Sequence, residues 1–229
     1  MTESDFERAR TPAAKRAREE AILAAAARLA AANGVREVTV TAIAEEVGMH
    51  KSAMLRYFET REDIFLQLAA EAWAEWSAAV RGRLENLTAR RSAGRQEWEQ
   101  TAREVAGTLA SSLVARPLFC DLLAHTPLNL ERNVSLGRVR AFKTRAIAET
   151  GAVSATLCTV TPLRMDQAHS VVATATSMAG ALWQMAAPGT KLRGLYESDP
   201  ELAHAIVDVE PRLVDILSAL LIGYAARST

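Results

Sequence analysis

Cysteine is scarce in this sequence, and its scarcity excludes two kinds of small, cross-linked domain. Only Cys120 and Cys158 occur among 229 residues, and neither belongs to a CxxC pair or to a paired cysteine and histidine spacing. We therefore expect neither a disulfide framework nor a zinc site. A nucleophile paired with a base, a phosphate-binding loop and a metal-ligand spacing are missing too. The sequence thus predicts no enzyme, no cofactor and no metal.

An excess of charge is also missing, because 27 basic residues balance 27 acidic ones. With a net charge of zero, the chain has no global field that attracts nucleic acid, and any affinity for DNA must come from a local patch. This balance argues against a non-specific DNA-coating protein, which binds through many phosphate contacts. A site-specific reader of DNA remains consistent with it.

Long apolar runs are absent as well. No stretch reaches the ~20 residues that span a bilayer, and no N-terminal segment combines a basic start, an apolar core and a cleavage site. We therefore expect no membrane association and a cytoplasmic location.

What the sequence does contain is a helical pattern with a short, distinctive unit in residues 40–65. Ile43 and Val47 lie four residues apart, on one face of a first helix for which Thr39 is the expected N-cap. Gly48 follows and can adopt the positive φ that ends a helix. The unit therefore predicts a first helix and a tight turn.

A second helix is expected to start near His50. Met54 and Phe58 are again four residues apart and should pack on the first helix, which leaves an outer face formed by Lys51, Ser52, Leu55 and Arg56. A helix that enters the major groove needs donors or slim apolar groups for the base edges, and cations or hydroxyls for the phosphates. This face supplies both, so the unit predicts a helix-turn-helix that binds DNA.

The residues of this unit resemble the TetR family of transcriptional regulators. Such proteins typically carry a motif close to TxxxIAxxxGVSxxxLYxYFxxKExLF, and the present chain has VTAIAEEV followed by GMHKSAMLRYFETREDIF. The direct matches are Thr39, Ile43, Ala44, Gly48, Tyr57, Phe58, Glu62 and Phe65, with conservative replacements at Met49, Met54, Arg61 and Ile64. The match covers about the first quarter of the chain.

The resemblance implies that residues 50–57 form the recognition helix and that Thr41, Tyr57 and Arg61 bind phosphate. Together, the motif and the resemblance give these DNA-binding residues: Thr39, Thr41, His50, Lys51, Ser52, Ala53, Leu55, Arg56, Tyr57 and Arg61.

Three of these positions depart from the family pattern and bear on the operator sequence. His50 replaces the usual Ser or Thr, Leu55 stands where Tyr is common, and Thr41 where Arg is frequent. Leu55 and Ala53 cannot donate hydrogen bonds and would contact thymine methyl groups, whereas Lys51 would contact guanine O6 or N7. We hypothesise a site with thymine steps beside a guanine. The alternative for Leu55 is a core position.

The fold class is predicted as all-α: an N-terminal three-helix helix-turn-helix head plus a larger, TetR-like C-terminal helical bundle. The expected division is a flexible tail at 1–11, a DNA-binding domain at 12–60 and a ligand-binding and dimerisation domain at 61–229. Besides the two short helices, we expect helices at about 12–32, 60–87, 98–115, 118–125, 130–159 with a kink or break at Gly151, 165–187, and 200–226 with a break or bend at Pro211.

The C-terminal domain is larger than dimerisation alone requires, and a helical bundle of this size can hold a pocket. The resemblance implies an effector site there. The candidate lining residues are Trp98, Cys120, His125, Asn129, Phe142, His169, Met178, Trp183 and Met185. Alternatively, the tryptophans and methionines fill the core, and His125 and Asn129 cap helices.

The last helix is apolar over an arc that is too wide for one partner, with Leu213, Ile216, Leu217, Leu220 and Leu221. The resemblance likewise implies a homodimer through the last two long helices. We therefore predict a dimeric, sequence-specific transcriptional regulator, most simply a repressor that an apolar or amphipathic small molecule releases from a palindromic DNA operator. The alternative is a helical adaptor or metabolite-binding protein whose head reads no specific operator.

Overall fold

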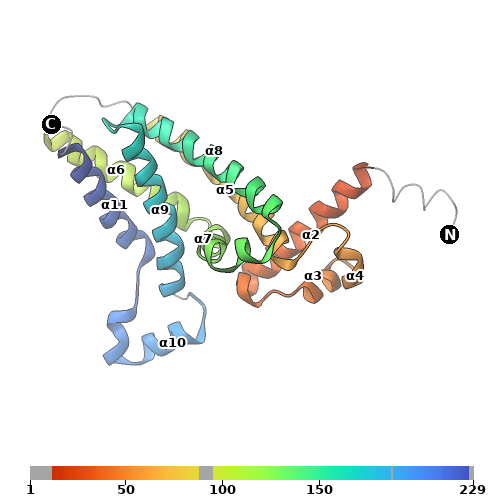
Figure 1. Cartoon of the computed structure of the whole chain (residues 1–229). Coiled ribbons are helices and arrows are strands. Elements are labelled where there is room, and N and C mark those ends of the chain that lie inside the picture. Colours follow the sequence, from red (N-terminus) through yellow and green to blue (C-terminus); the bar gives the residue numbers. More distant parts are fainter. Residues whose placement is uncertain (1–11, 88–94, 187, 227–229) are drawn as a thin grey trace.

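The computed structural model describes residues 12–87, 95–186 and 188–226 (Figure 1). Over these ranges the chain is helical and contains no strand, which confirms the all-α prediction. The tail predicted at 1–11 lies outside the described residues, and so does most of the chain between the helices predicted at 60–87 and 98–115. We call residues 12–60 the head and residues 61–226 the body.

The head consists of three α-helices and a short 3-10 turn. Its elements are α2 (Pro12–Asn33), η1 (Val35–Glu37), α3 (Val40–Glu46) and α4 (Lys51–Met54). Thr39 caps α3 as expected, because its Oγ1 accepts a hydrogen bond of 3.1 Å from the amide of Ala42. Gly34 and Gly48 end α2 and the α3 turn with φ values of 85° and 62°. Both conformations favour glycine, since a side chain is strained at positive φ.

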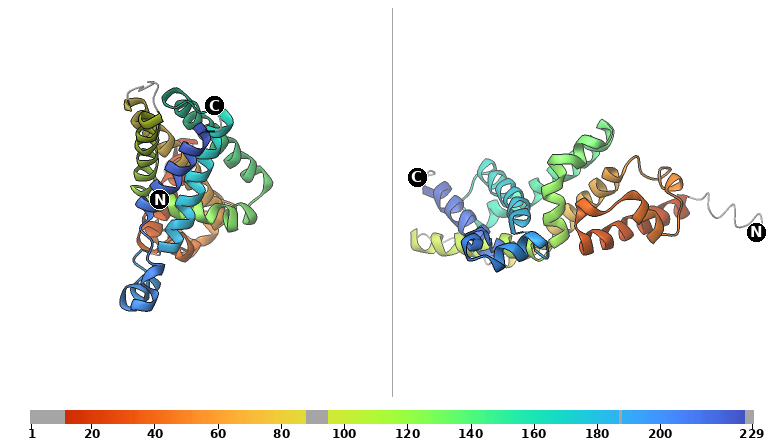
Figure 2. Two further views of the ribbon diagram at one scale, coloured as in Figure 1. Left: turned by 90° about the vertical axis from the view of Figure 1, so that its left-hand side faces the viewer. Right: turned by 90° about the horizontal axis from the view of Figure 1, so that it is seen from below.

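The body begins with the long helix α5 (Arg61–Asn86), which Thr60 caps by accepting the amide of Asp63 at 3.1 Å. The remaining elements are α6 (Arg95–Val114), α7 (Pro117–His125), η2 (Thr126–Leu130), η3 (Glu131–Asn133), α8 (Leu136–Val160), α9 (Met165–Ala186), α10 (Lys191–Ser198), η4 (Pro200–Ala205) and α11 (Val209–Ala226). In space, α5 lies along α8, α6 along α11, and α7 packs on α9 (Figure 1). Viewed from below, the head occupies one end of an elongated molecule (Figure 2).

The predicted start of the helix that follows α7 is wrong. The helix expected from residue 130 begins at Leu136, because the chain continues past His125 through the π-type turn η2 and the turn η3 before Ser135 caps α8. Gly151 lies inside α8 and does not break it. The local cost of a glycine is evidently offset by the packing of α8 along α5.

The predicted final helix at 200–226 is also wrong in its first part. Pro200–Ala205 forms a 3-10 segment, and a helix that was not predicted, α10, precedes it. The break falls at residues 206–208, ahead of Pro211, which lies in the first turn of α11. A proline is tolerated there because the first-turn amides have no partner within the helix.

A cluster of aromatic rings forms the centre of the body. The Trp76 side chain is fully buried, and its Nε1 donates a hydrogen bond of 2.9 Å to the Ser112 hydroxyl. Its ring lies edge-on to Trp73 with centroids 5.5 Å apart, and 5.8 Å from the ring of Phe119. This cluster holds α5, α6 and α7 together.

Among the described residues, no single helix is both long and apolar enough to cross a membrane, and α6 and the α7–η3 segment, bent by 87°, would pass that test only as a pair.

Candidate nucleic-acid interface

Helix α4, the predicted recognition helix, exposes one face and buries the other. Met54 and Phe58 are 1% and 3% exposed, so they form the inner face as predicted. Leu55 is 53% exposed, which shows that the alternative reading of Leu55 as a core residue is wrong. Lys51, Ser52 and Arg56 are exposed too, and Ala53 is half-buried. The outer face therefore presents a cation, a hydroxyl and a slim apolar group side by side.

The helix is shorter than the predicted span of 50–57. His50 precedes it as an N-cap in extended conformation without a side-chain cap bond. After Met54 the chain continues in turns, in which the amides of Tyr57 and Phe58 both donate to the Met54 carbonyl, at 2.9 and 3.2 Å. Tyr57 is half-buried. The turn keeps Leu55 and Arg56 on the outside.

The two predicted threonines of the head differ in their roles. Thr41 is exposed and free to approach a phosphate from the first turn of α3. The Thr39 hydroxyl accepts the Ala42 amide, so its oxygen is already used as a cap. It retains its proton for donation to an outside acceptor.

Arg61 lies differently from the expectation of a phosphate contact. Its Nε donates to the carbonyl of Val38 and its Nη2 to the carbonyl of Val35, while Nη1 pairs with Glu62 at 3.0 Å. The guanidinium also lies over the ring of Phe65, 4.7 Å from its centroid. With its donors used in this way, Arg61 holds the η1 segment onto the start of α5.

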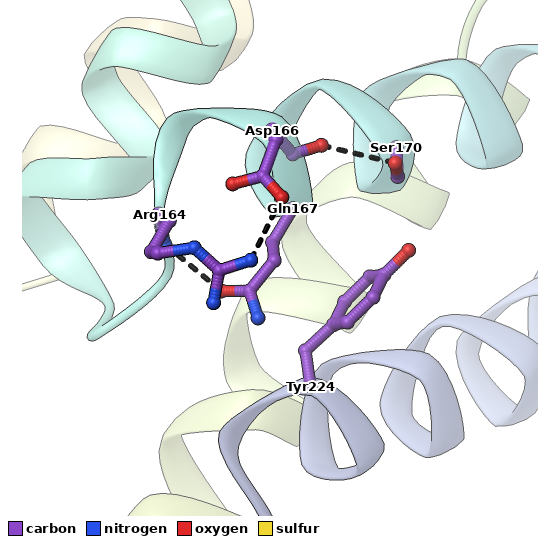
Figure 3. Close-up of a pocket in the computed structure, with 5 residues that line it drawn as sticks. All are labelled: Arg164, Asp166, Gln167, Ser170 and Tyr224. Carbon is purple, nitrogen blue, oxygen red and sulfur yellow. Dashed lines mark hydrogen bonds and ion pairs between the residues drawn. The ribbon is translucent and has the colours of Figure 1, made fainter. Parts of the chain in front are cut away.

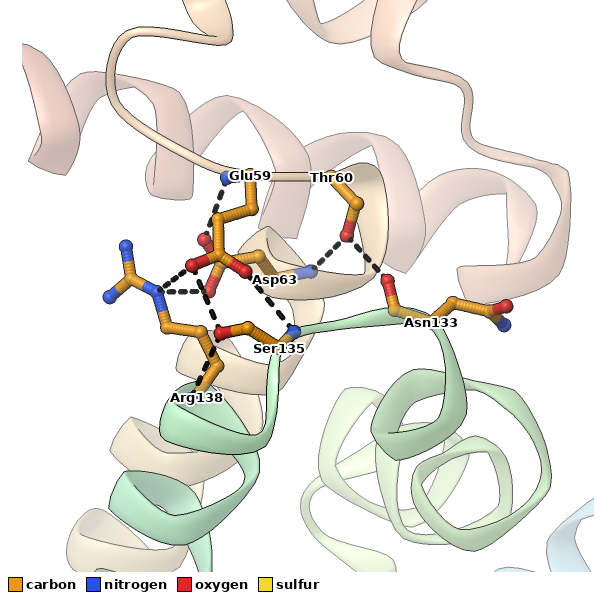
Figure 4. A network of polar contacts seen from close by, with 6 residues as sticks. All are labelled: Glu59, Thr60, Asp63, Asn133, Ser135 and Arg138. Atoms are coloured by element: carbon orange, nitrogen blue, oxygen red, sulfur yellow. Dashed lines mark hydrogen bonds and ion pairs between the residues drawn. The ribbon is translucent and has the colours of Figure 1, made fainter.

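A polar network fixes the end of the head to the start of α8 (Figure 4). Glu59 accepts hydrogen bonds from the amide and hydroxyl of Ser135, at 3.2 and 3.1 Å, and these bonds lower the pKa of its carboxyl. Arg138 places its Nε 3.2 Å from the carboxylate of Asp63. Burial raises the pKa of the Asp63 carboxyl above its usual value. The hydrogen bond from the Glu59 amide and the charge of Arg138 lower this pKa, but burial has the larger effect. The Thr60 hydroxyl adds a bond to the Asn133 carbonyl.

The residues predicted to line an effector pocket are not gathered at one cavity. Cys120 is fully buried, its Sγ donates to the Leu113 carbonyl, and burial together with Asp121 raises its pKa to about 12. Phe142 is buried, Trp98 and Met178 are half-buried, and His169 and Met185 are exposed. Cys120 and Phe142 thus fill the core.

His125 and Asn129 lie one helical turn apart at the junction of α7 and η2. His125 is 9% exposed and its Nε2 lies 3.3 Å from the Asp121 carboxylate. Within the described part of the chain, its Nδ1 and the Oδ1 of Asn129 are buried without a hydrogen-bond partner. Buried polar atoms of this kind are rare, because each forfeits its bonds to water.

The larger cavity, of about 360 Å³, opens between the ends of α6 and α9 and the chain around α10. Of the predicted residues, Trp183 lines it, together with Val114, Ala186, Pro188, Gly189, Arg193, Glu197, Val207, Asp208 and Val209. Its wall is thus mainly apolar, with charged groups at Arg193, Glu197 and Asp208.

A smaller cavity, of about 190 Å³, lies at the turn between α8 and α9 and is lined by Arg164, Asp166, Gln167, Ser170 and Tyr224 (Figure 3). The Arg164 guanidinium pairs with the Asp166 carboxylate at 2.8 Å. The backbone amide of Arg164 donates a hydrogen bond of 2.9 Å to the side-chain oxygen of Gln167. These contacts join Arg164, which precedes α9, to the first turn of that helix.

A three-helix head with one exposed helix face, attached to a larger helical body, is compatible with a helix-turn-helix that docks in the major groove. The model of the family described as "Bacterial regulatory proteins, tetR family" matches residues 22–68, and the model described as "Tetracyclin repressor-like, C-terminal domain" matches residues 70–228. The chain belongs to the TetR family of transcriptional regulators. This confirms the predicted family, and it confirms that the chain is a regulator and not an enzyme.

Several solved structures have a similar fold. One is the fatty acid degradation regulator FadR from Bacillus halodurans, which is 15% identical to this chain with a TM-score of 0.51; the alignment covers 90% of this chain and 94% of that one. FadR from Bacillus subtilis in complex with stearoyl-CoA has 17% identity and a TM-score of 0.51, with 89% and 97% covered. A putative TetR-family regulator from Mesorhizobium loti has 13% identity and a TM-score of 0.52, with 93% and 97% covered. At these identities the likeness concerns the fold. No curated protein matches the sequence significantly.

Proposed function

We propose that the protein acts in the cytoplasm as a homodimeric repressor, which binds a palindromic operator through residues 12–60 and leaves it when a small molecule occupies the domain at 61–229. The observation that carries the proposal is the outer face of α4. Lys51, Ser52 and Leu55 are exposed there, while Met54 and Phe58 anchor the helix from inside. A major-groove reader needs this combination of a donor, a hydroxyl and an apolar group on a rigid support.

The proposed dimer uses α9 and α11. Leu213, Leu217 and Leu221 are fully buried and form one face of α11, whereas Ile216 and Leu220 are only half-buried on another. A second copy that packs on the half-buried face would remove the remaining apolar surface from water. Two copies related by a two-fold axis present two recognition helices, which matches a palindromic site.

The proposed effector is an apolar or amphipathic molecule. A volume of about 360 Å³ with a mainly apolar wall and a few charged groups is of the kind that binds small ligands. A second part of the body, away from this cavity, has polar atoms without partners among the described residues. There the buried His125 Nδ1 and Asn129 Oδ1 need a hydrogen bond that a ligand or a water molecule would supply. The Bacillus subtilis relative is a complex with stearoyl-CoA, so long-chain acyl-CoA belongs among the compounds to test.

The operator is the first part of the proposal to test. We expect the full chain to enrich a palindrome from a random duplex library, with thymine steps beside a guanine in each half-site. Lys51→Ala should weaken binding to that palindrome by about 5- to 150-fold, since one base-reading side chain contributes roughly 1–3 kcal/mol. The selection should be made at two salt concentrations, because phosphate contacts make affinity salt-dependent.

Lys191→Ala is the matched control, because Lys191 is an exposed lysine on α10, in the body. It should bind the palindrome like the wild type. If neither the wild type nor the control enriches any sequence, the chain is not an operator reader, and the adaptor or metabolite-binding reading takes its place.

The release step makes a separate prediction. A compound that raises the melting temperature of the full chain should also weaken its binding to the selected palindrome, because a ligand shifts only those states that it binds differently. The measurement combines a thermal-shift screen of acyl-CoAs and other amphipathic compounds with a binding titration at saturating compound. A compound that stabilises the protein but leaves operator affinity unchanged would contradict release by an effector.

A further inference from the structure

Asp121 on α7 is a buried carboxylate at the contact between the head and the body. It is 8% exposed. Its Oδ2 accepts the backbone amide of Val35, the first residue of η1, at 2.7 Å. Its Oδ1 accepts the side chain of Gln184 from α9 at 2.7 Å and lies 3.3 Å from Nε2 of His125. One carboxylate thus joins the head to two helices of the body.

The bonds to Asp121 keep it charged although it is buried. Burial raises the pKa of its carboxyl, but the bonds from His125, Val35 and Gln184 outweigh burial and lower the pKa below the usual value. A buried carboxylate without partners is costly, so the three donors and the carboxylate hold each other in place.

The same residue of the head is held from a second side. The amide of Val35 donates to Asp121, and the carbonyl of Val35 accepts from Arg61 at the start of α5. Val35 is itself 1% exposed, and α7 contacts η1 as well as α2 and α9. Figure 1 shows α7 between α9 and the base of α2. Both polar backbone groups of Val35 are therefore fixed by helices of the body.

We propose that Asp121 is a positioning residue for DNA reading, which transmits the position of α9, through Gln184, to the η1 segment that carries α3 and the recognition helix. The consequence for DNA rests on the function proposed above, whereas the coupling between α9 and the head does not. Gln184 follows Trp183, a residue of the larger cavity. A ligand that displaces this end of α9 would therefore pull on the same carboxylate.

The coupling is tested by amide hydrogen exchange in the full chain without DNA. We expect the Val35 amide to be protected in the wild type, because it donates to Asp121. It should exchange on the order of tenfold faster in Gln184→Ala, because Asp121 loses a charge-assisted bond that orients it. The Met49 amide, which bonds to the Ala44 carbonyl at 2.8 Å inside the head, should keep its rate. Met185→Ala is the matched control, since Met185 is an exposed neighbour on α9, 57% exposed. Equal Val35 rates in Gln184→Ala and Met185→Ala, or an unprotected Val35 in the wild type, would overturn the coupling.

Variants of Asp121 separate positioning from general packing. Asp121→Ala removes the acceptors and should expose the Val35 amide to exchange. Asp121→Asn should keep most of the protection. Its side-chain oxygen still accepts the Val35 amide, and the Gln184 side chain can turn its own oxygen toward the new NH₂ group of the asparagine. If Asp121→Asn exchanges at Val35 as fast as Asp121→Ala, the positioning role is wrong.

The consequence for DNA is measured with the selected palindrome. Gln184→Ala should bind it at least about fivefold more weakly than Met185→Ala, the lower end of typical coupling between sites. Faster exchange at Val35 with unchanged operator affinity would overturn the role in DNA reading. Failure to select any duplex would instead count against the proposed function, and the exchange rates would still decide whether α9 is coupled to the head.

Discussion

Replacing Trp76 by alanine is expected to lower the free energy of unfolding by about 3–5 kcal/mol, the range for removing a large aromatic side chain from a core. The side chain is fully buried, and neighbouring helices α6 and α7 pack on it through Ser112 and Phe119. Removing it leaves a cavity and takes away the hydrogen bond that Nε1 donates to Ser112. Because a typical domain is stable by 5–15 kcal/mol, the variant would be only marginally folded.

The measurement is urea unfolding followed by far-ultraviolet circular dichroism, which does not depend on the deleted fluorophore. Trp183→Ala is the control, since Trp183 is half-buried at the edge of the larger cavity and has less area to lose. If the two variants lose the same free energy, the aromatic cluster does not hold the body together in the way that its geometry indicates.

Much of the head could be predicted because its signals are local. Thr39 is the predicted N-cap of α3, and its hydroxyl accepts the amide three residues later. Gly48 has the positive φ that the turn requires, and Met54 and Phe58 are buried. Each of these features follows from residues within one or two helical turns, which is the range over which sequence patterns determine structure.

Boundaries in the body were less predictable because packing determines them. The sequence predicts a break at residues 126–129, because Pro127 removes a helix donor, yet residues 126–130 form a π-type turn that lies against α5. Helix α10 was not predicted at all. It contains Gly194 in eight residues and is covered mainly by η4, so neither propensity nor a buried face marks it in the sequence.

The contacts of Arg61 and Asp121 could not be predicted from the sequence for a related reason. The resemblance to the family pattern placed Arg61 on DNA, but its donors reach carbonyl groups 23 and 26 residues back in the chain. Two of the three partners of Asp121, Val35 and Gln184, lie 86 residues before and 63 residues after it. A lone aspartate in an apolar helix gives no sign of such contacts, although its burial once the fold is known requires partners.

The second large effect is expected at Gly180, where α9 passes against the backbone of α7. A Cβ added there would lie 2.8 Å from the Ala124 nitrogen, 3.1 Å from the Leu123 carbonyl carbon and 3.2 Å from the Ala124 Cα. These are backbone atoms, so no rotation of a side chain relieves the clash. We expect Gly180→Ala to destabilise the protein by about 2–3 kcal/mol, toward the upper end of the usual cost of overpacking.

The same change at another glycine should have the opposite sign, which separates the clash from the general effect of alanine in a helix. Gly151 lies inside α8, and a Cβ there meets nothing within 4 Å. Gly151→Ala should therefore stabilise the protein by about 0.5–1 kcal/mol, because alanine has less freedom to lose on folding. Thermal and urea unfolding of the two variants measure the difference directly. Equal shifts in the two variants would show that α7 and α9 can move apart without cost.

Gly180→Ala should also loosen the link between α9 and the head, on which the proposed DNA reading depends. The reason is that Gln184 lies one turn further along α9 and bonds to Asp121 on α7. A displacement of α9 away from α7 lengthens this bond, so the Val35 amide should exchange faster than in the wild type, as in Gln184→Ala. In Gly151→Ala it should exchange at the wild-type rate, since α8 carries no partner of Asp121 among the contacts described. A Gly180→Ala protein that is destabilised but keeps full protection at Val35 would mean that the close approach of the two helices serves packing alone.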